Sequence, residues 1–289
     1  MIHFKKLCSC CFVIGNDIPE IDTLEHEKRQ TPSIHDCCQV QFSNKTSLNQ
    51  TVIESSKLTL LVLETVHMIT GASYEITPSG LKSSKRKSKD NCVYAGSQSK
   101  IDNTWINDII LPESEKGVGK RHFMIQHIRG QNYSDKGSYF IKDLGDGLGT
   151  FIKLSKPLKL ISNFIVSFGD SHLVIKIEKK DLILRFIDGP RNDEKFTFTS
   201  DESPIKLGRM VDCNVRIDDN SLSRYHCMCY YEEDNWYLID GDGDKGSTNG
   251  TWLFAESFFE IYDGLILKVG ETLFKALISS EEQGNKFDN

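Results

Sequence analysis

Three short clusters of glycine, hydroxyl and cationic residues lie close together in the second half of the sequence. They are Gly208-Arg209, Ser223-Arg224-Tyr225-His226 and Gly246-Ser247-Thr248-Asn249-Gly250-Thr251. Together they offer a forked cation, short hydroxyl donors, an amide side chain and glycine-flanked backbone. This set suits a tetrahedral, doubly charged oxyanion on a peptide, because a guanidinium binds such a group in a bidentate manner. No evident pair of nucleophile and base accompanies the clusters, so they indicate binding rather than catalysis.

His226 follows Ser223 by three residues, and the pair admits two interpretations. A general base beside a Ser nucleophile would need an orienting acid and an oxyanion hole, and no GxSxG context occurs in the sequence. The favoured interpretation is a His at the start of a strand that joins two neighbouring loops by hydrogen bonds. Gly208 is expected to support these loops, and Gly246 and Gly250 are expected to adopt positive φ there.

The elements that must position these clusters are short strands. From Lys57 onward the sequence consists of short runs rich in Val, Ile, Phe, Tyr and Trp, separated by turn residues. Many of the runs alternate between apolar and polar residues, which is typical of half-buried strands. No convincing helical stripe exceeds a few turns. The pattern predicts an all-β chain of antiparallel sandwiches, in which the three clusters are loops meeting at one end.

An internal duplication divides this β-rich region. Gly149-Thr150-Phe151 matches Gly250-Thr251-Trp252, and Gly169 matches Gly270 at the same distance of 20 residues. We therefore predict tandem sandwiches at residues 57–181 and 182–279, after a poorly ordered extension at 1–56 and before a tail at 280–289.

The order Gly-Arg, Ser-x-x-His and Ser-Thr-Asn-Gly-Thr resembles the forkhead-associated (FHA) domain over residues 182–279. This resemblance implies a sandwich of two twisted antiparallel sheets that binds phosphothreonine peptides through its loops. By motif position, Arg209 and Ser223 would hold the phosphate, with Thr248 nearby. From its charge alone, Arg224 is either a second cation for the phosphate or a solvent-exposed side chain. Asn249 would hold the backbone of the ligand.

Three further features concern the loops and ligands. Gly208 and His226 would support the loops, and the segment Phe254–Gly264 is a candidate for contacting residues beyond the phosphothreonine. The run Asp240–Lys245 lengthens the third loop by four residues relative to the usual FHA pattern and adds carboxylates near the phosphate. It begins like a calcium-binding loop, but Lys245 stands at the sixth position and Thr251 at the twelfth, so we reject an EF-hand. No cofactor and no metal site is predicted.

The first copy keeps the spacing of the fold and loses the ligand groups. Ser97 stands where the second copy has Arg209, and Gly119 stands where it has Ser223; the positions of Ser247, Thr248 and Asn249 are taken by Asp146, Gly147 and Leu148. We expect a degenerate FHA-like copy that serves structure or docking. Its basic insert, residues 82–89, is interpreted as a solvated loop in preference to a binding patch or a localisation signal.

Charge and cysteine content limit the function further. Residues 57–181 carry 19 Lys/Arg and 13 Asp/Glu, whereas residues 182–279 carry 10 and 18, so the motif-bearing half is acidic and does not suit a nucleic-acid ligand. The nine cysteines include one CxxC, Cys8 to Cys11, and no zinc-binding pattern. This usage is typical of a reducing, intracellular compartment. No apolar run is long enough for a membrane-spanning helix.

The first 15 residues leave three interpretations open. They are a partly ordered tail, S-acylation of Cys8, Cys10 and Cys11 beside Lys5 and Lys6, or a cleaved secretory signal. N-myristoylation is excluded because the second residue is Ile2 rather than Gly.

These observations predict a non-enzymatic adaptor that recognises phosphothreonine in a partner protein. No kinase catalytic loop, P-loop or hydrolase elbow occurs in the sequence. The alternative is a structural tandem sandwich with a vestigial phosphate site. We expect the cytoplasm or nucleus as the compartment, with peripheral membrane contact through the N-terminal cysteines if they are acylated. The oligomeric state is left open.

Overall fold

The computed structural model describes residues 56–87, 90–130 and 137–280. Apart from the short 3-10 helix η3 (Ser200–Glu202), the described elements are strands, so the all-β prediction is confirmed. Within these ranges no helix is long and apolar enough to cross a membrane. Most of the N-terminal extension, with Cys8, Cys10 and Cys11, and residues 281–289 of the tail lie outside the described residues.

One long sheet runs through the whole molecule and contains eleven strands. In spatial order its strands are β15 (Lys195–Phe198), β14 (Asp181–Asp188), β13 (Ser171–Glu178), β12 (Ile165–Phe168), β20 (Trp252–Phe254), β10 (Thr150–Lys153), β22 (Ile266–Val269), β23 (Thr272–Ser280), β1 (Ser56–Glu64), β2 (Ser73–Thr77) and β3 (Gly80–Leu81).

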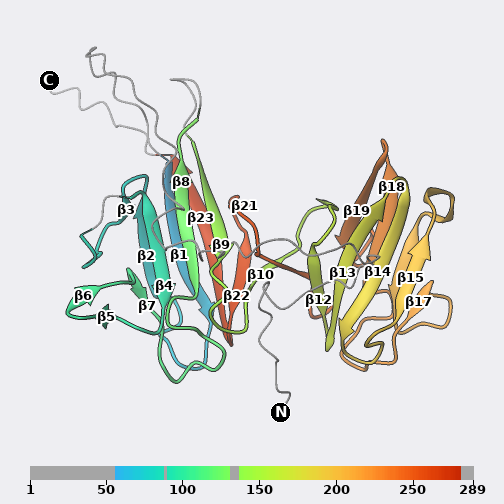
Figure 1. Cartoon of the computed structure of the whole chain (residues 1–289), viewed down its shortest axis with the longest axis horizontal. Helices are drawn as coiled ribbons and strands as arrows, with labels where there is room; N and C mark the ends of the chain where they lie inside the picture. Colours follow the sequence, from blue (N-terminus) through green and yellow to red (C-terminus); the bar gives the residue numbers. More distant parts are fainter. Residues whose placement is uncertain (1–55, 88–89, 131–136, 281–289) are drawn as a thin grey trace, which may run out of the picture.

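Two five-stranded sheets complete two sandwiches with the two halves of the long sheet (Figure 1). The strands of the first are β21 (Phe259–Glu260), β9 (Ser138–Asp143), β8 (Phe123–Ile128), β4 (Cys92–Gly96) and β7 (Ile109–Ile110). Those of the second are β11 (Leu158–Lys159), β19 (Asn235–Asp240), β18 (Cys227–Glu232), β16 (Ile205–Gly208) and β17 (Val215–Arg216). A separate hairpin is formed by β5 (Lys100–Ile101) and β6 (Thr104–Trp105).

Alternation of apolar residues explains how these strands face the cores. In β1, Leu58, Leu60 and Val62 are at most 1% exposed while the residues between them are half-buried. In β19, Trp236 and Leu238 point inward in the same way. Because successive side chains of a strand point to opposite faces, this pattern buries one face of each strand.

The two cores differ in which parts of the sequence form them. The core of the second sandwich consists of buried residues between Leu154 and Leu253. The core of the first consists of residues between Leu58 and Ile152 together with residues between Ala255 and Ala276. The first sandwich is therefore discontinuous in sequence. In Figure 1 the red strands β22 and β23 lie among the blue and green strands of the first sandwich.

This arrangement is a reciprocal exchange of hairpins between the two sequence repeats. The hairpin β22–β23 of the second repeat inserts between β10 and β1 of the first. The hairpin β12–β13 of the first repeat inserts between β20 and β14 of the second. Each sandwich thus draws on both 57–181 and 182–279, and the packing units do not coincide with the sequence repeats.

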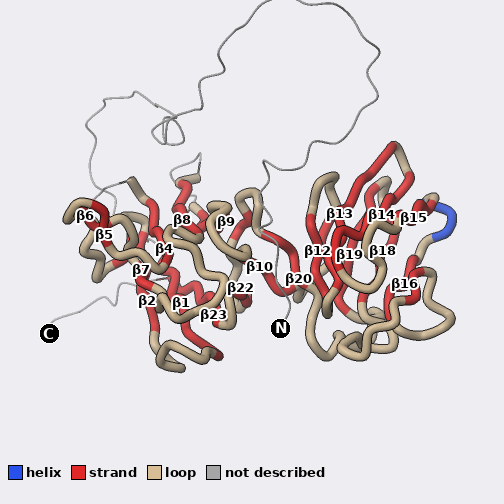
Figure 2. Tube along the Cα trace, turned by 60° about the horizontal axis from the view of Figure 1, so that its bottom comes forward, coloured by secondary structure: helices blue, strands red, loops and turns tan. Residues whose placement is uncertain are grey.

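The chain crosses between the sandwiches through β10 and β20 (Figure 2). These two strands pair with each other in antiparallel register, with Ile152 opposite Leu253 at the centre. Burial holds the exchanged hairpin in place: Leu267, Val269 and Phe274 of β22 and β23 are all 0% exposed. Each such side chain contributes about 1.5–3 kcal/mol when buried.

The exchange corrects one prediction about the binding loops. Phe254–Gly264 was expected to border the motif-bearing site, but β21 pairs with β9 of the first sandwich and Ile261 belongs to the first core. After β20 the segment pairs with the first sandwich, and only Phe259 also packs against the second core, so no contact places it among the ligand loops.

Candidate functional site

The first of the three predicted loops begins where β16 ends at the buried Gly208. A Cβ at this position would lie 2.3 Å from the carbonyl oxygen of Arg224, so only glycine allows the two loops to approach this closely. The backbone N–H of Arg209 donates to the carbonyl of Ser223 at 3.4 Å, and that of Met210 donates to the carbonyl of Arg224 at 3.2 Å. The Arg209 side chain is exposed, and it forms no ion pair within the described part of the chain.

The second loop is held by His226, which is fully buried. Its Nδ1 accepts the backbone N–H of Ser223 at 3.1 Å, and its Nε2 lies 3.2 Å from the carbonyl of Gly250. The ring is therefore neutral, with the proton on Nε2, and it joins the second loop to the third. Burial lowers the pKa of His226, which favours this neutral form. Arg224 is exposed beside it.

The third loop places two ligand residues against the second. The backbone N–H of Thr248 donates to Oγ of Ser223 at 2.9 Å, and the two hydroxyl oxygens lie 3.3 Å apart. The Asn249 side chain is exposed and donates from Nδ2 to the carbonyl of Ser221 at 2.8 Å. Arg209, Ser223, Thr248 and Asn249 are thus carried on three loops that contact one another.

The shape of the third loop depends on the first carboxylate of the Asp-rich run, in a role that the sequence analysis did not assign to it. Asp240 accepts the backbone N–H of Ser247 at 2.9 Å, its hydroxyl at 2.7 Å and the hydroxyl of Thr251 at 2.7 Å. Gly250 has a φ of +79°, as expected. Gly246 does not have a positive φ, so the prediction for that residue was wrong, and the turn around it is fixed by Asp240 instead.

The Asp-rich extension of this loop is stabilised by its own backbone. Asp242 accepts the N–H groups of Lys245 at 3.0 Å and Asp244 at 3.2 Å through Oδ1. The N–H of Lys245 is the main reason that the pKa of Asp242 is lowered. Within the described ranges, no group of three or more His, Cys, Asp or Glu side chains could hold a metal ion. The extension therefore behaves as a self-capped turn.

A turn from the first sequence repeat borders the site, because of the hairpin exchange. The backbone N–H of Asp170 donates to Oδ2 of Asp219 at 3.1 Å. A Cβ on Gly169, whose φ is +54°, would lie 2.5 Å from the same carboxylate oxygen and 2.6 Å from Oγ of Ser221. Since Ser221 also accepts the Asn249 amide, the β12–β13 turn supports the ligand loops of the second sandwich. The signal for this turn in the sequence was the equal spacing of the glycine pairs.

The equivalent position of the first sandwich has the same scaffold and different ligand groups. His122 accepts the N–H of Gly119 at 3.0 Å and lies 3.2 Å from the carbonyl of Gly149, as His226 does with its own loops. A Cβ on Gly119 would lie 1.8 Å from the carbonyl oxygen of Asp146, and one on Gly147 would lie 2.4 Å from Nδ1 of His122. Serine therefore cannot stand at 119 while Asp146 keeps this place.

A pocket of about 420 Å³ lies at this position, and its lining includes glycines, two apolar side chains and few polar groups. The lining residues are Ser97, Gly117, Val118, Gly119, Lys120, Asp146, Gly147 and Leu148. The pocket has Asp146 at its edge and no counterpart of Arg209. It therefore differs from the residues of the second sandwich that suit a phosphate.

The FHA domain family model matches two segments of the chain, residues 98–169 and 205–272. No curated protein matches. The chain is also similar to the solution structure of the FHA domain of an Arabidopsis thaliana hypothetical protein, with 23% identity, coverage of 37% of this chain and 92% of that chain, and a TM-score of 0.21. FHA domains are protein-interaction modules that generally bind phosphothreonine peptides. The two matched segments make this chain an FHA-domain protein that carries the domain twice.

Proposed function

We propose that the second sandwich binds a phosphothreonine-containing segment of a partner protein, and that the chain acts as a phosphorylation-dependent adaptor. The observation that carries this proposal is the exposed Arg209 guanidinium, which has no ion pair in the described structure and lies on a loop bonded to Ser223. An unpaired guanidinium, on a loop bonded to the loop that carries Ser223, fits an oxyanion better than a role in stability, because exposed charges contribute little to folding.

The roles of the individual groups follow from their chemistry. Arg209 would hold two phosphate oxygens in a bidentate manner, and Ser223 and Thr248 would donate hydroxyl hydrogens to the phosphate. Arg224 would add a second cation from the rim. The Asn249 side chain would bind the ligand backbone through its carbonyl oxygen, since its amide group already donates to Ser221.

The arrangement of the carboxylates supports this proposal. Asp240 directs its carboxylate toward Ser247 and Thr251, and Asp242 binds the N–H groups of its own turn. Both negative charges are therefore engaged with donors of the loop, which reduces their repulsion of a bound phosphate. A ligand that a kinase has phosphorylated is also consistent with action in the cytoplasm or nucleus.

The test is binding of a peptide pool with a central phosphothreonine and mixed flanking residues, compared with the same pool carrying threonine. The full chain is expected to prefer the phosphorylated pool. The substitution Arg209→Ala should weaken that binding by roughly tenfold to a hundredfold, because a charge-assisted hydrogen bond contributes about 1.5–3 kcal/mol. Anisotropy or calorimetry gives the dissociation constants.

Arg185→Ala is the matched control, because Arg185 is an exposed Arg in β14 of the same sandwich. It should leave both dissociation constants unchanged. Equal binding of the two pools by the native chain and by both variants would instead support a vestigial site in a structural tandem sandwich. In that case phosphate or sulfate would also fail to raise the unfolding temperature.

A further inference from the structure

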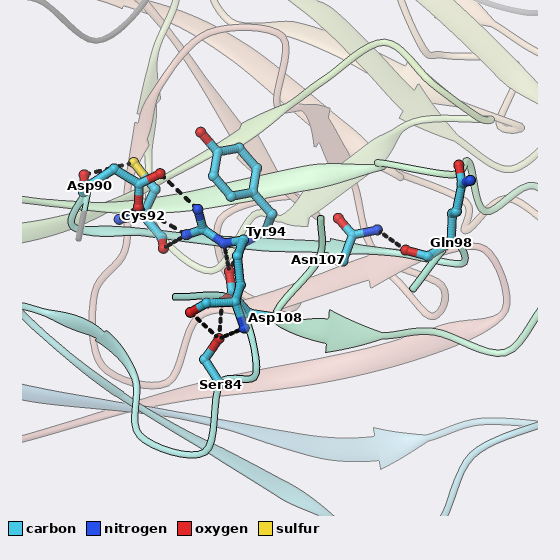
Figure 3. Close-up of polar contacts among 8 residues, drawn as sticks. Ser84, Asp90, Cys92, Tyr94, Gln98, Asn107 and Asp108 are labelled. Atoms are coloured by element: carbon cyan, nitrogen blue, oxygen red, sulfur yellow. Dashed lines mark hydrogen bonds and ion pairs between the residues drawn. The ribbon is translucent and has the colours of Figure 1, made fainter. Parts of the chain in front are cut away.

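The described part of the basic insert, residues 82–87, is anchored to the first sandwich. Arg86 donates from Nη1 and Nη2 to Asp90 at 2.8 and 2.9 Å, from Nε to Asp108 at 2.9 Å, and from Nη2 to the carbonyl of Cys92 at 2.6 Å. Its side chain is 9% exposed and that of Asp108 is 2% exposed. Ser84 also bonds to Asp108. Figure 3 shows these contacts around Ser84, Asp90, Cys92 and Asp108. The described part of the insert is thereby fixed on the sandwich.

The β5–β6 hairpin packs against this insert through one aromatic side chain. The ammonium nitrogens of Lys85, from the insert, and Lys100, from β5, each lie 4.7 Å from the ring centroid of Trp105. Two cations from separate segments therefore share one indole, although their charges repel each other. Cation–π attraction at an exposed site is weak, enough to orient lysines but not to neutralise them.

A third segment joins the same face. The Asn107 amide donates to the carbonyls of Lys120 and Gln98, both at 2.7 Å, and the contact with Gln98 is drawn in Figure 3. The guanidinium of Arg121 lies 3.7 Å from the ring centroid of Tyr94. We call the resulting surface the cationic face. Its members are Lys85, Lys100, Lys120 and Arg121.

The lysines of the cationic face have no ion-pair partners. All three are exposed, and none forms an ion pair within the described ranges. Arg86, in contrast, is matched by two aspartates. Placing several like charges together without partners costs free energy of folding, so their presence requires another reason.

Exposed apolar side chains lie in the β5–β6 hairpin and in the strand that follows it. Ile101 in the hairpin is 50% exposed, and Ile110 in β7 is 38% exposed. Strand β7 is also the terminal strand of its sheet, so one of its backbone edges has no neighbouring strand there. The cationic face thus combines positive charge with exposed apolar side chains.

We propose that the cationic face binds an acidic, apolar-containing segment of a partner protein. Nucleic acid suits it less well, because Trp105 lies under two cations of the chain and Tyr94 lies under two more, Arg86 and Arg121. Those rings are not free to stack on bases, which is how unpaired nucleic acids bind such surfaces. The exposed isoleucines add a preference for a polypeptide. This surface is independent of the phosphothreonine site.

The experiment uses the full chain and a short fluorescein-labelled peptide rich in Glu with a few Leu residues. The paired substitution Lys85→Glu and Lys100→Glu reverses two charges over Trp105. It should weaken peptide binding by at least about tenfold, because like charges across an interface repel. The control pair is Lys159→Glu and Lys195→Glu, two exposed lysines of the second sandwich with the same change in net charge. It should change the affinity by less than about twofold.

A local readout accompanies the affinities. Peptide binding should change the tryptophan emission of the native chain, and Trp105→Phe should remove most of that change. The proposal is overturned if the native chain does not bind the peptide, if both charge-reversal pairs weaken binding equally, or if a single-stranded oligonucleotide or an anionic vesicle binds the face more tightly than the peptide does. Unfolding temperatures of all variants establish that each is folded.

Discussion

At the scale of single residues, the histidines show how the loops are held. His226 and His122 make the same pair of contacts in the two sandwiches, yet only the second sandwich has the Arg and hydroxyl groups that suit a phosphate. The histidine is therefore part of the scaffold of the loops, and the ligand groups are a separate addition. This distinction favours a structural role for His226 over that of a general base.

The structural role of His226 predicts a pH dependence of stability. Burial lowers the pKa of His226 from its ordinary value of 6.5, and it does the same for His172. The unfolded chain then binds protons more readily than the folded chain as the pH falls below that value. The stabilising contribution is complete above about pH 6.5 and is lost as the pH falls toward the lower pKa of the folded state. Denaturant unfolding at a series of pH values measures this slope.

Two substitutions make the assignment specific. His226→Asn should lower the stability at neutral pH but reduce the slope below about pH 6.5, since the titrating group is gone. His67→Asn, at an exposed histidine of the first sandwich, should change neither quantity. An unaltered slope in the His226 variant would mean that the ring does not carry the expected proton linkage.

How far single residues could be predicted depended on their role. The motif residues were predictable because their residue types indicate their chemistry. They are Arg209, Ser223, Thr248 and Asn249. The loop-holding role of Asp240 and Asp219 was not identified, because in a sequence a carboxylate that accepts hydrogen bonds from a loop looks the same as an acid facing water. Only the folded geometry separates these two roles.

At the scale of elements, two equivalent turns occupy exchanged positions. The β12–β13 turn at Gly169 contacts Asp219 and Ser221 of the second sandwich. The β22–β23 turn at Gly270 contacts Glu115 and Lys116 of the first, and the N–H of Glu271 donates to Glu115 at 2.5 Å. Each turn therefore supports the loops of the sandwich that contains mainly the other repeat.

The two turns offer a direct test of the exchange. Gly169→Ala adds a Cβ at a φ of +54° and 2.5 Å from Asp219, so it should displace the loops near Asn249. We expect it to weaken phosphothreonine-pool binding by several-fold, although Gly169 lies in the first repeat. Gly270→Ala, at a φ of +59°, imposes a similar strain on the first sandwich and should leave that binding unchanged.

In an unexchanged fold Gly270→Ala would weaken the binding and Gly169→Ala would leave it unchanged, because the β22–β23 turn would then border the site of its own repeat. The pair of variants thus distinguishes the two topologies under identical binding conditions. Thermal unfolding of both variants shows whether the loss of affinity is local or follows from general destabilisation.

Strand positions were more predictable than strand partners. Alternation of apolar residues indicates which face of a strand is buried, as in β1 and β19, but it does not indicate which sheet supplies its neighbours. The two repeats end in hairpins of similar pattern, so either hairpin could complete either sandwich. The exchange leaves no mark on any local feature of the sequence. It could therefore not be predicted from the sequence.

At the scale of the whole molecule, the exchange has a consequence for how the chain can be divided. All buried residues of the second core lie between Leu154 and Leu253, and the ligand loops and the Gly169 turn lie in the same interval. The first sandwich needs both ends of the described chain. The contiguous unit that carries the candidate site is therefore about residues 154–258, and it is offset from the sequence repeat at 182–279.

This offset predicts opposite behaviour for two fragments. Residues 154–258 should fold cooperatively and bind the phosphothreonine pool about as well as the full chain. Residues 182–280 lack Val166, Phe168, Leu173 and Ile175, each at most 2% exposed in the second core. At about 1.5–3 kcal/mol for each side chain, that loss approaches the 5–15 kcal/mol that stabilises a typical domain. The shorter fragment should therefore be largely unfolded, as circular dichroism and calorimetric unfolding would show. If residues 182–280 fold to equal stability and bind the pool, their own β22–β23 hairpin completes the sandwich, and the exchange is not required for the site.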